Sequence, residues 1–311
     1  MIGKFQISKY RTFFSNNVNT SSSEVQYTIN VHQSYQFYKT LFIMTASHPD
    51  ADFYPHATGF AAQMIKQNST EEPVKLYAGW FCPFVQRVIL VLLEKNIPFQ
   101  YIEVNPYNKP QSLLKLNPRG LIPTLEYEGK VLYESTIICE FLEDAYPSHW
   151  PRLLTREPFE RARLRIWIDH ITSRIIPAFH RFLQYQSTSP QDPKLLSLRT
   201  TFLTSIYQFT QEMDPVGPYF TGASPCLVDF ILAPWALRIW VFDYFKGGLH
   251  IEELGDMRER WEKWVDAIEA RKSIKMSLSD TEHYLPIYQR YADDAAQSQL
   301  GKAMREGGGV P

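Results

Sequence analysis

A cysteine at the junction between a predicted strand and a predicted helix constrains this chain more than any other feature. Residues 74–78 alternate like a short strand, and residues 83–96 place their apolar side chains on one helical face. Cys82 therefore lies at the N-terminus of a helix, with Pro83 at the first helical position, where a missing N–H costs nothing. Because the unpaired N–H groups and the helix dipole favour negative charge there, the pattern predicts a thiol that tends toward the reactive thiolate.

The residue three positions after Cys82 decides which thiol chemistry is available. This residue is Val85 rather than a second cysteine. The other two cysteines of the chain, Cys139 and Cys226, lie far from Cys82 in the sequence. Without a local resolving partner, Cys82 is expected to form a mixed disulfide with an external thiol, which a second thiol then breaks. The alternative for Cys82 is a buried and inert cysteine. Cys139 is interpreted in that second way. Three cysteines in 311 residues form no disulfide framework and fit a reducing compartment.

Charge and hydropathy exclude several classes of function. The formal net charge of −1 gives no electrostatic basis for nucleic-acid binding. No apolar run approaches the ~18 residues that a membrane-spanning helix needs, so no membrane association is expected. No metal site is expected either, because the cysteines are isolated and no histidine pair with helical spacing lies near a carboxylate.

The predicted elements divide the chain into four regions. Residues 1–72 show no sustained period and are expected to form a largely irregular N-terminal extension. Residues 73–148 predict a βαβ–α–ββα unit with strands near 74–78, 99–104, 124–127 and 130–133, the last two joined by a hairpin. Residues 155–292 predict an all-helical domain with helices near 157–183, 193–213, 226–245, 252–271 and 281–292. Residues 293–311, which contain a glycine run, are expected to form a mobile tail.

The N-terminal extension bears on localisation. Its first 23 residues carry Lys4, Lys9 and Arg11 and no acidic residue, as a mitochondrial presequence does. A disordered tail, or a segment upstream of a later start at Met44, is the alternative. A cytoplasmic protein is expected, and a mitochondrial one is the alternative if the basic segment is a presequence.

The order of elements and motifs resembles that of a soluble glutathione transferase, and the details resemble the omega class. The matching motifs cover about residues 73–290 and are Cys82-Pro83-Phe84, Asn108-Lys109-Pro110, the run from Leu116 to Pro123, Glu134-Ser135 and the run from Cys226 to Phe230. The resemblance implies a thioredoxin-like α/β N-terminal domain followed by an all-α helical-bundle C-terminal domain. It also implies glutathione as cosubstrate, a small electrophilic or disulfide substrate, and a homodimer.

The resemblance assigns a glutathione site to these motifs. It implies a cis bond between Ile122 and Pro123, which presents the Ile122 backbone as an edge partner for the cysteinyl part of glutathione. Ser135 suits the γ-glutamyl carboxylate, Glu134 its ammonium group, and Lys109 the glycyl carboxylate. Without the resemblance, Ser135 is interpreted as a helix cap, Pro123 as a turn proline and Lys109 as a surface residue. The implied glutathione-binding residues are Phe84, Lys109, Ile122, Pro123, Glu134 and Ser135.

Two residues of the helical domain complete the predictions from the resemblance. The second substrate is expected to bind between the domains, with Trp235 as its candidate contact. Asp229 resembles the capping-box residue of the family's central helix, although Cys226 stands where Ser or Thr is usual. Because cysteine is a poor cap acceptor, Ser224 and Pro225 are expected to supply the cap instead.

A cysteine at the catalytic position predicts the reaction. Most glutathione transferases place a Tyr or Ser hydroxyl there and favour conjugation, whereas a cysteine forms a disulfide with glutathione. The prediction is a thiol transferase or reductase that acts through a Cys82–glutathione mixed disulfide. Its reactions would include deglutathionylation, dehydroascorbate reduction and reductive removal of substituents. The alternative is a non-catalytic ligand carrier or regulatory protein with the same fold.

Overall fold

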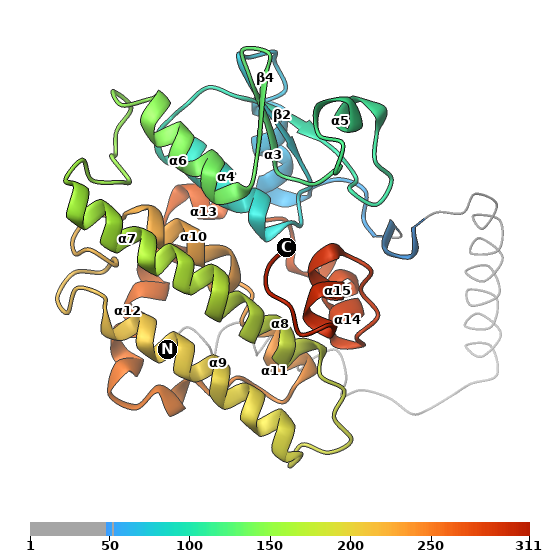
Figure 1. Cartoon of the computed structure of the whole chain (residues 1–311), viewed down its shortest axis with the longest axis vertical. Helices are drawn as coiled ribbons and strands as arrows, with labels where there is room; N and C mark the ends of the chain where they lie inside the picture. Colours follow the sequence, from blue (N-terminus) through green and yellow to red (C-terminus); the bar gives the residue numbers. More distant parts are fainter. Residues whose placement is uncertain (1–47, 52) are drawn as a thin grey trace, which may run out of the picture. The chain divides into compact units, whose positions relative to one another are not determined.

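The computed structural model describes residues 48–51 and 53–311 (Figure 1). The basic segment 1–23 and Met44, on which the mitochondrial alternative depends, lie outside the described residues. Within the described part, no helix is both long and apolar enough to cross a membrane.

Four short strands form one mixed sheet in the order β2-β1-β3-β4. They are β1 (Val74–Ala78), β2 (Gln100–Glu103), β3 (Thr124–Tyr127) and β4 (Lys130–Tyr133). The pair β1–β2 is parallel, and the pairs β1–β3 and β3–β4 are antiparallel. Leu76 at the centre of β1 pairs with Tyr101 on one side and Leu125 on the other, and all three are buried. The alternating apolar pattern of the sequence thus becomes the middle of the sheet, as predicted.

The hairpin between β3 and β4 has the predicted two-residue turn. Glu128 and Gly129 both have positive φ, 50° and 76°. A type I′ turn requires positive φ at both central positions, and its twist matches that of the flanking strands. This turn sets the register that brings Thr124 opposite Tyr133.

Three helices accompany the sheet: α4 (Pro83–Glu94), α5 (Gln111–Leu116) and α6 (Ser135–Ala145). Helix α4 packs against α6 on one side and against α10 (Leu227–Ala236) of the helical part on another (Figure 1). Residues 85–92 of α4 are consequently all buried, including Gln86 and Arg87. The sequence predicted a single apolar face, and the difference arises because α4 packs against both α6 and α10.

Helices make up the rest of the described chain. They are α7 (Pro158–His170), the π-helical turn η2 (Ile171–Ile175), α8 (Ile176–Gln184), α9 (Pro193–Gln211), α10, α11 (Trp240–Phe245), η3 (Ile251–Met257), α12 (Arg258–Glu269), α13 (Lys272–Met276), η4 (Thr281–His283), α14 (Leu285–Ala292) and α15 (Gln299–Arg305). The helix predicted near 226–245 is divided into α10 and α11, with Pro234, which lacks an N–H, in the last turn of α10. In the helix predicted near 252–271, Gly255 has a φ of 59° that interrupts the helical path.

The N-terminus of α10 is capped by its own residues rather than by Ser224 and Pro225. Cys226 is the N-cap, and its N–H donates to Asp229 Oδ2 over 2.7 Å. Asp229 Oδ1 also accepts from the Phe220 N–H and from the indole N–H of Trp264, each over 2.8 Å. This buried carboxylate therefore joins α10 to α12 and supports the predicted structural role of Asp229.

The segment before the sheet is more regular than predicted. Residues 49–51 form a short 3₁₀ turn, η1 (Pro49–Ala51), and residues 59–67 form helix α3 (Gly59–Gln67). Helix α3 packs against α13 and buries Ala61 and Met64. The described part of the predicted irregular extension thus has a helix, which distant contacts stabilise, among them the hydrogen bond from the Ala61 N–H to the Leu278 carbonyl over 3.1 Å.

The predicted mobile tail also differs in the structure. Residues 299–305 form α15, which packs against α8 and buries Leu300 and Met304. Ser298 caps this helix by accepting a hydrogen bond from the Gly301 N–H over 3.0 Å. The sequence did not predict this helix, because seven residues show too little periodicity to be recognised.

Candidate functional site

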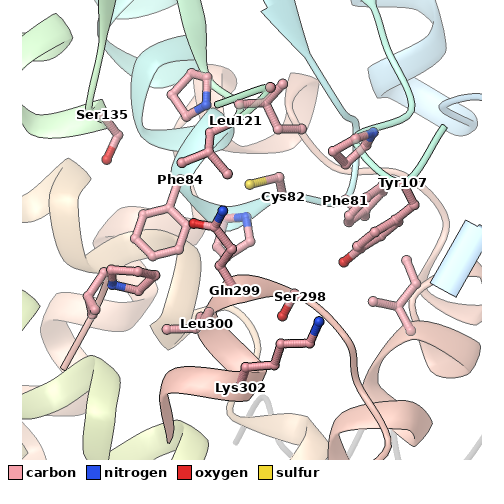
Figure 2. Close-up of a pocket in the computed structure, with 18 of the residues that line it drawn as sticks. Phe81, Cys82, Phe84, Tyr107, Leu121, Ser135, Ser298, Gln299, Leu300 and Lys302 are labelled. Carbon is pink, nitrogen blue, oxygen red and sulfur yellow. The ribbon is translucent and has the colours of Figure 1, made fainter. Parts of the chain in front are cut away.

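A cavity of ≈ 630 Å³ opens at the N-terminus of α4. Its volume lies within the ~300–1,000 Å³ typical of small-molecule sites. Most of its wall comes from the α/β part and from the segment after residue 286 (Figure 2), and His48, Thr172 and His180 also contribute. Seven of the eight residues predicted from sequence line this cavity: Cys82, Phe84, Lys109, Ile122, Pro123, Glu134 and Ser135.

Cys82 occupies the N-cap of α4 and is partly exposed. Figure 2 shows its sulfur facing the cavity between Leu121 and Phe84. Burial of the sulfur raises the pKa of the Cys82 thiol, and the N–H groups of Val85 and Phe84 oppose this effect. The helix-end chemistry predicted from sequence is therefore present, but burial is the larger influence on the pKa.

Ser135 is the first residue of α6 and lies at the bottom of the cavity wall, where it is 6% exposed. Its Oγ accepts a hydrogen bond from Arg87 Nη1 over 3.2 Å, so its hydroxyl hydrogen stays available. The N–H groups of the first helical turn have no intrahelical partners and point out of the helix end. Together, Ser135 and the start of α6 form a site suited to a carboxylate.

Glu134, rather than Ser135, is the N-cap of α6 and has a positive φ of 69°. Such a backbone conformation is uncommon for a residue other than glycine and marks positions that are constrained by their surroundings. Its carboxylate lies 2.9 Å from Arg119 Nη1, and both side chains are 46% exposed. Arg119 was not predicted from sequence, and it orients a carboxylate at the edge of the cavity.

Ile122 and Pro123 form the predicted cis bond. Within the described residues, the backbone N–H and C=O of Ile122 have no hydrogen-bond partner. This part of the wall is thus an open peptide edge, as required for pairing with an extended ligand. Lys109 is exposed at the rim, and its Nζ donates to the Arg119 carbonyl over 3.0 Å.

Trp235 is the predicted site residue that does not belong to the cavity wall. It is 1% exposed, and its ring packs edge-on against Phe84 with centroids 4.9 Å apart. Arg87 covers the other side of the indole at 4.6 Å from the ring centroid. Trp235 therefore does not line this cavity, because α10 turns it toward α4, where Phe84 and Arg87 pack against it.

Residues after 286 supply a wall that sequence reasoning missed. Tyr288 and Tyr291 of α14 line the cavity, and Figure 2 shows Ser298, Gln299 and Lys302 facing Cys82 from the opposite side. The available signal was the aromatic pattern Tyr284, Tyr288 and Tyr291, whose spacing places all three rings on one helical face.

Aromatic side chains form a second unpredicted wall. Tyr107 stacks on Phe81 with centroids 6.2 Å apart, and His48 stacks on the same tyrosine at 4.8 Å. Phe53 packs edge-on against Phe81 at 4.5 Å. Tyr77 of β1 is buried beside Val104 and does not line the cavity.

His180 of α8 and Thr172 of the π-helical turn also line the cavity. Neither His180 ring nitrogen has a hydrogen-bond partner within the described residues, and the ring is 3% exposed. Burial lowers the pKa of His180 to about 3, so the imidazole is neutral at physiological pH. The described residues contain no cluster of three or more His, Cys, Asp or Glu side chains arranged to hold a metal ion.

Comparisons with known proteins agree with this geometry. A family model described as the glutathione S-transferase N-terminal domain matches residues 81–145. Glutathione S-transferase omega-1 of Sus scrofa is 32% identical over 196 residues, which span 63% of this chain and 76% of the relative. A probable glutathione S-transferase DHAR1 of Oryza sativa subsp. japonica is 30% identical over 206 residues, which span 66% of this chain and 87% of the relative.

A solved structure gives the same result for the fold. The crystal structure of glutathione transferase Omega 3C from Trametes versicolor superposes with a TM-score of 0.71 and 45% sequence identity. The superposition covers 78% of this chain and 100% of that protein. The described sheet and helices thus form the same fold as this solved transferase.

Proposed function

Because this chain belongs to the glutathione S-transferase family, and within it to the omega class, we propose that it is a glutathione-dependent thiol transferase and reductase with Cys82 as its nucleophile. The position of Cys82 carries this proposal. It lies at the N-terminus of α4 and faces a cavity that six further predicted glutathione-binding residues line. A hydroxyl at that position would favour conjugation, whereas a thiol forms a disulfide with glutathione.

The cavity wall fits glutathione in three places. Ser135 and the start of α6 offer hydrogen-bond donors for the γ-glutamyl carboxylate, and Glu134 offers an acceptor for the adjacent ammonium group. The unpaired backbone of Ile122 suits the N–H and C=O of the cysteinyl residue. Lys109, exposed at the rim, suits the glycyl carboxylate. Phe84 and Pro123 supply apolar surface between these polar groups.

The proposed reaction has two disulfide exchanges. In the first, the Cys82 thiolate attacks the glutathione sulfur of a glutathionylated thiol, a Cys82–glutathione disulfide forms, and the substrate leaves as a thiolate. In the second, the thiolate of another glutathione attacks this disulfide, so that oxidised glutathione leaves and the Cys82 thiolate is restored. Dehydroascorbate reduction and reductive removal of substituents would use the same nucleophile and the same mixed disulfide.

Turnover of the mixed disulfide of glutathione with 2-mercaptoethanol tests the proposal. The wild type should reduce it in the presence of glutathione, and Cys82→Ser should act no faster than the uncatalysed reaction. Cys139→Ala is the matched control, because Cys139 is fully buried and lies outside the cavity wall. Conjugation of glutathione to 1-chloro-2,4-dinitrobenzene, followed in parallel, should be weak in the wild type.

The same assays decide between the proposal and its alternative. If the wild type binds glutathione, but neither the wild type nor Cys139→Ala reduces the disulfide, the chain is a ligand carrier or regulator. If Cys82→Ser retains wild-type turnover, another group is the nucleophile.

We further propose a homodimer in the cytoplasm. Four large apolar side chains are exposed on β4, α6 and α7: Tyr133, Ile137, Phe159 and Ile166. Exposed apolar groups concentrated on neighbouring elements are typical of subunit interfaces. Analytical ultracentrifugation should give a dimer for the wild type and a monomer for Ile137→Glu combined with Ile166→Glu. The cytoplasmic location fits the three free cysteines of the described structure.

A further inference from the structure

Two arginines are buried beside Cys82 without a carboxylate partner. Arg87 is 1% exposed and Arg238 is 2% exposed. Among the described residues, their hydrogen-bond partners are backbone carbonyls and the uncharged side chains of Ser135, Gln86 and Tyr288. Burying a charge without a counter-charge is strongly unfavourable, so such a pair requires an explanation beyond packing.

Arg87 lies on the first turns of α4, five residues after the cysteine. Its Nε donates to the Ile231 carbonyl over 3.0 Å, and its Nη1 donates to Ser135 Oγ over 3.2 Å. Its guanidinium lies 5.3 Å from the ring centroid of Phe84 and 4.6 Å from that of Trp235, and Arg87 lines the cavity. Nη2 has no hydrogen-bond partner within the described residues. The guanidinium is thus held in place with one donor left over.

Arg238, two residues after α10, approaches the cysteine from the helical part. Its Nη1 donates to Gln86 Oε1 over 2.6 Å, and its Nη2 lies 3.5 Å from the carbonyl of Phe81, the residue before Cys82. Its guanidinium lies 5.1 Å from the ring centroid of Tyr284. Its Nε has no partner within the described residues. Arg238 is therefore bound to the chain on both sides of the nucleophile.

The other ionisable groups around the sulfur do not compensate these charges. These groups are His48 before η1, Tyr101 of β2, Tyr107 and Lys109 of the following loop, Tyr133 of β4, Glu134 before α6, Cys139 of α6, His180 of α8, Tyr284 before α14, Tyr288 and Tyr291 of α14, and Lys302 of α15. Burial raises the pKa of Tyr288 to about 12 and of Cys139 to about 12, so both are neutral near pH 7. The carboxylate in this set, Glu134, already pairs with Arg119.

We propose that Arg87 and Arg238 are positioning residues for the disulfide exchange, because their buried positive charges stabilise the anionic form of the sulfur at Cys82. The first exchange begins with the Cys82 thiolate and the second restores it, and the two guanidiniums supply the counter-charge for this anion. Arg87 also contacts Ser135, so it links the γ-glutamyl carboxylate site to the reacting sulfur. Burial lowers the pKa of Arg87 to about 9, and the nearby sulfurs of Cys139 and Cys82 oppose this shift.

Alkylation of Cys82 by two reagents of similar size, one neutral and one anionic, tests the proposal. Both iodoacetamide, which is neutral, and iodoacetate, which is anionic, transfer their carbon to the thiolate and release iodide. Buried positive charge should raise the iodoacetate-to-iodoacetamide rate ratio of the wild type several-fold above that of 2-mercaptoethanol. Cys82→Ser gives the background from the other cysteines. The proposal rests on Cys82 as the nucleophile of the proposed function, yet alkylation requires neither glutathione nor a disulfide, so the failures of the two are distinguishable.

Variants of the arginines separate charge from packing. Arg87→Gln and Arg238→Gln should each lower the iodoacetate rate at pH 7.5 about tenfold, as a pKa increase of about one unit would, and lower the rate ratio toward that of 2-mercaptoethanol. Arg238→Lys should keep a raised ratio. Arg258→Gln, which removes an exposed guanidinium paired with Glu262, should leave both rates unchanged.

The outcomes that overturn the proposal are equally definite. A wild-type ratio no higher than that of 2-mercaptoethanol overturns it without any variant, even if the glutamine variants do not fold. Folded glutamine variants with wild-type rates and ratio also overturn it. A loss of the ratio in Lys302→Gln, but not in the arginine variants, would assign the effect to the cavity rim instead.

Discussion

Arg119 Nη1 lies 2.9 Å from Glu134 Oε1, and this pair fixes the direction of a carboxylate that a positive φ already constrains. Glu134 occupies the N-cap of α6, where its φ of 69° turns the backbone sharply before the helix. Arg119 belongs to the turn between α5 and β3, so the two residues come from different segments. The ion pair holds an acceptor beside Ser135, at the place proposed for the ammonium group of glutathione.

Replacing Glu134 by Gln should weaken glutathione binding far more than replacing Arg119 by Met. A charge-assisted hydrogen bond contributes about 1.5–3 kcal/mol, so Glu134→Gln should raise the KM for glutathione at least about tenfold. The Arg119–Glu134 pair is solvent-exposed and contributes at most ~1 kcal/mol, so Arg119→Met should raise KM no more than about fivefold. Steady-state kinetics with saturating disulfide measures both. Equal effects, or a larger one for Arg119→Met, would contradict the assignment of Glu134.

Asp229 should be required for stability and dispensable for chemistry. It accepts three hydrogen bonds from buried donors, the N–H groups of Phe220, Cys226 and Trp264. Asp229→Ala leaves these donors without an acceptor and should lower the free energy of unfolding by at least ~3 kcal/mol. Urea unfolding followed by tryptophan fluorescence gives this value, with the exposed Asp266→Ala of α12 as the control. Activity per folded molecule should stay unchanged, and a selective loss of activity would assign Asp229 to the reaction.

His180 should make the fold sensitive to acid. Its pKa is about 3 in the folded state, below its ordinary value, so the unfolded state binds the proton more tightly. Its contribution to stability is complete above about pH 6.5 and is lost as the pH falls toward 3, by ~1.4 kcal/mol per pH unit. His180→Phe removes the titrating group. The difference in free energy of unfolding between this variant and the wild type should therefore be about 2 kcal/mol more favourable to the variant at pH 5 than at pH 7.5. Urea unfolding at both pH values measures the difference, and an equal difference at the two pH values would refute the assignment.

The local signals at the nucleophile and the hairpin were sufficient to predict that part of the fold. Pro83 after Cys82 determines where α4 begins, and Glu128-Gly129 determines the turn type, because both act through neighbouring backbone groups. The residues proposed for glutathione were assigned from the family resemblance rather than from the turns, and they line one cavity.

Contacts between distant segments were not predictable in the same way. Whether Trp235 faces the cavity or α4 depends on the rotation of α10, which its apolar sequence does not specify because nearly all its residues are buried. Arg87 lies within an apolar run of α4. A helix with one apolar face does not predict that this charged side chain is buried. The segment after residue 293 has few apolar residues, so only its contact with α8 reveals that it forms part of the cavity wall.

Arg181 should control how much space the second substrate has. Its Nη2 donates to the carbonyls of Gly307 and Gly308 over 3.2 and 2.8 Å, and residues shortly after these glycines, Val310 and Pro311, line the cavity. Hydrogen bonds of this kind contribute about 1 kcal/mol, so Arg181→Met should loosen this segment without unfolding the protein.

A bulky substrate should benefit from the Arg181 variant and a small one should not. The KM for the mixed disulfide of glutathione with 2-naphthalenethiol should fall several-fold in Arg181→Met, because Val310 can then move aside. The KM for the mixed disulfide with 2-mercaptoethanol should stay the same, since that substrate needs little of the cavity. Arg174→Met, which removes an exposed arginine from the preceding π-helical turn, should change neither value. A rise in KM for the bulky substrate would instead show that the segment contributes binding surface.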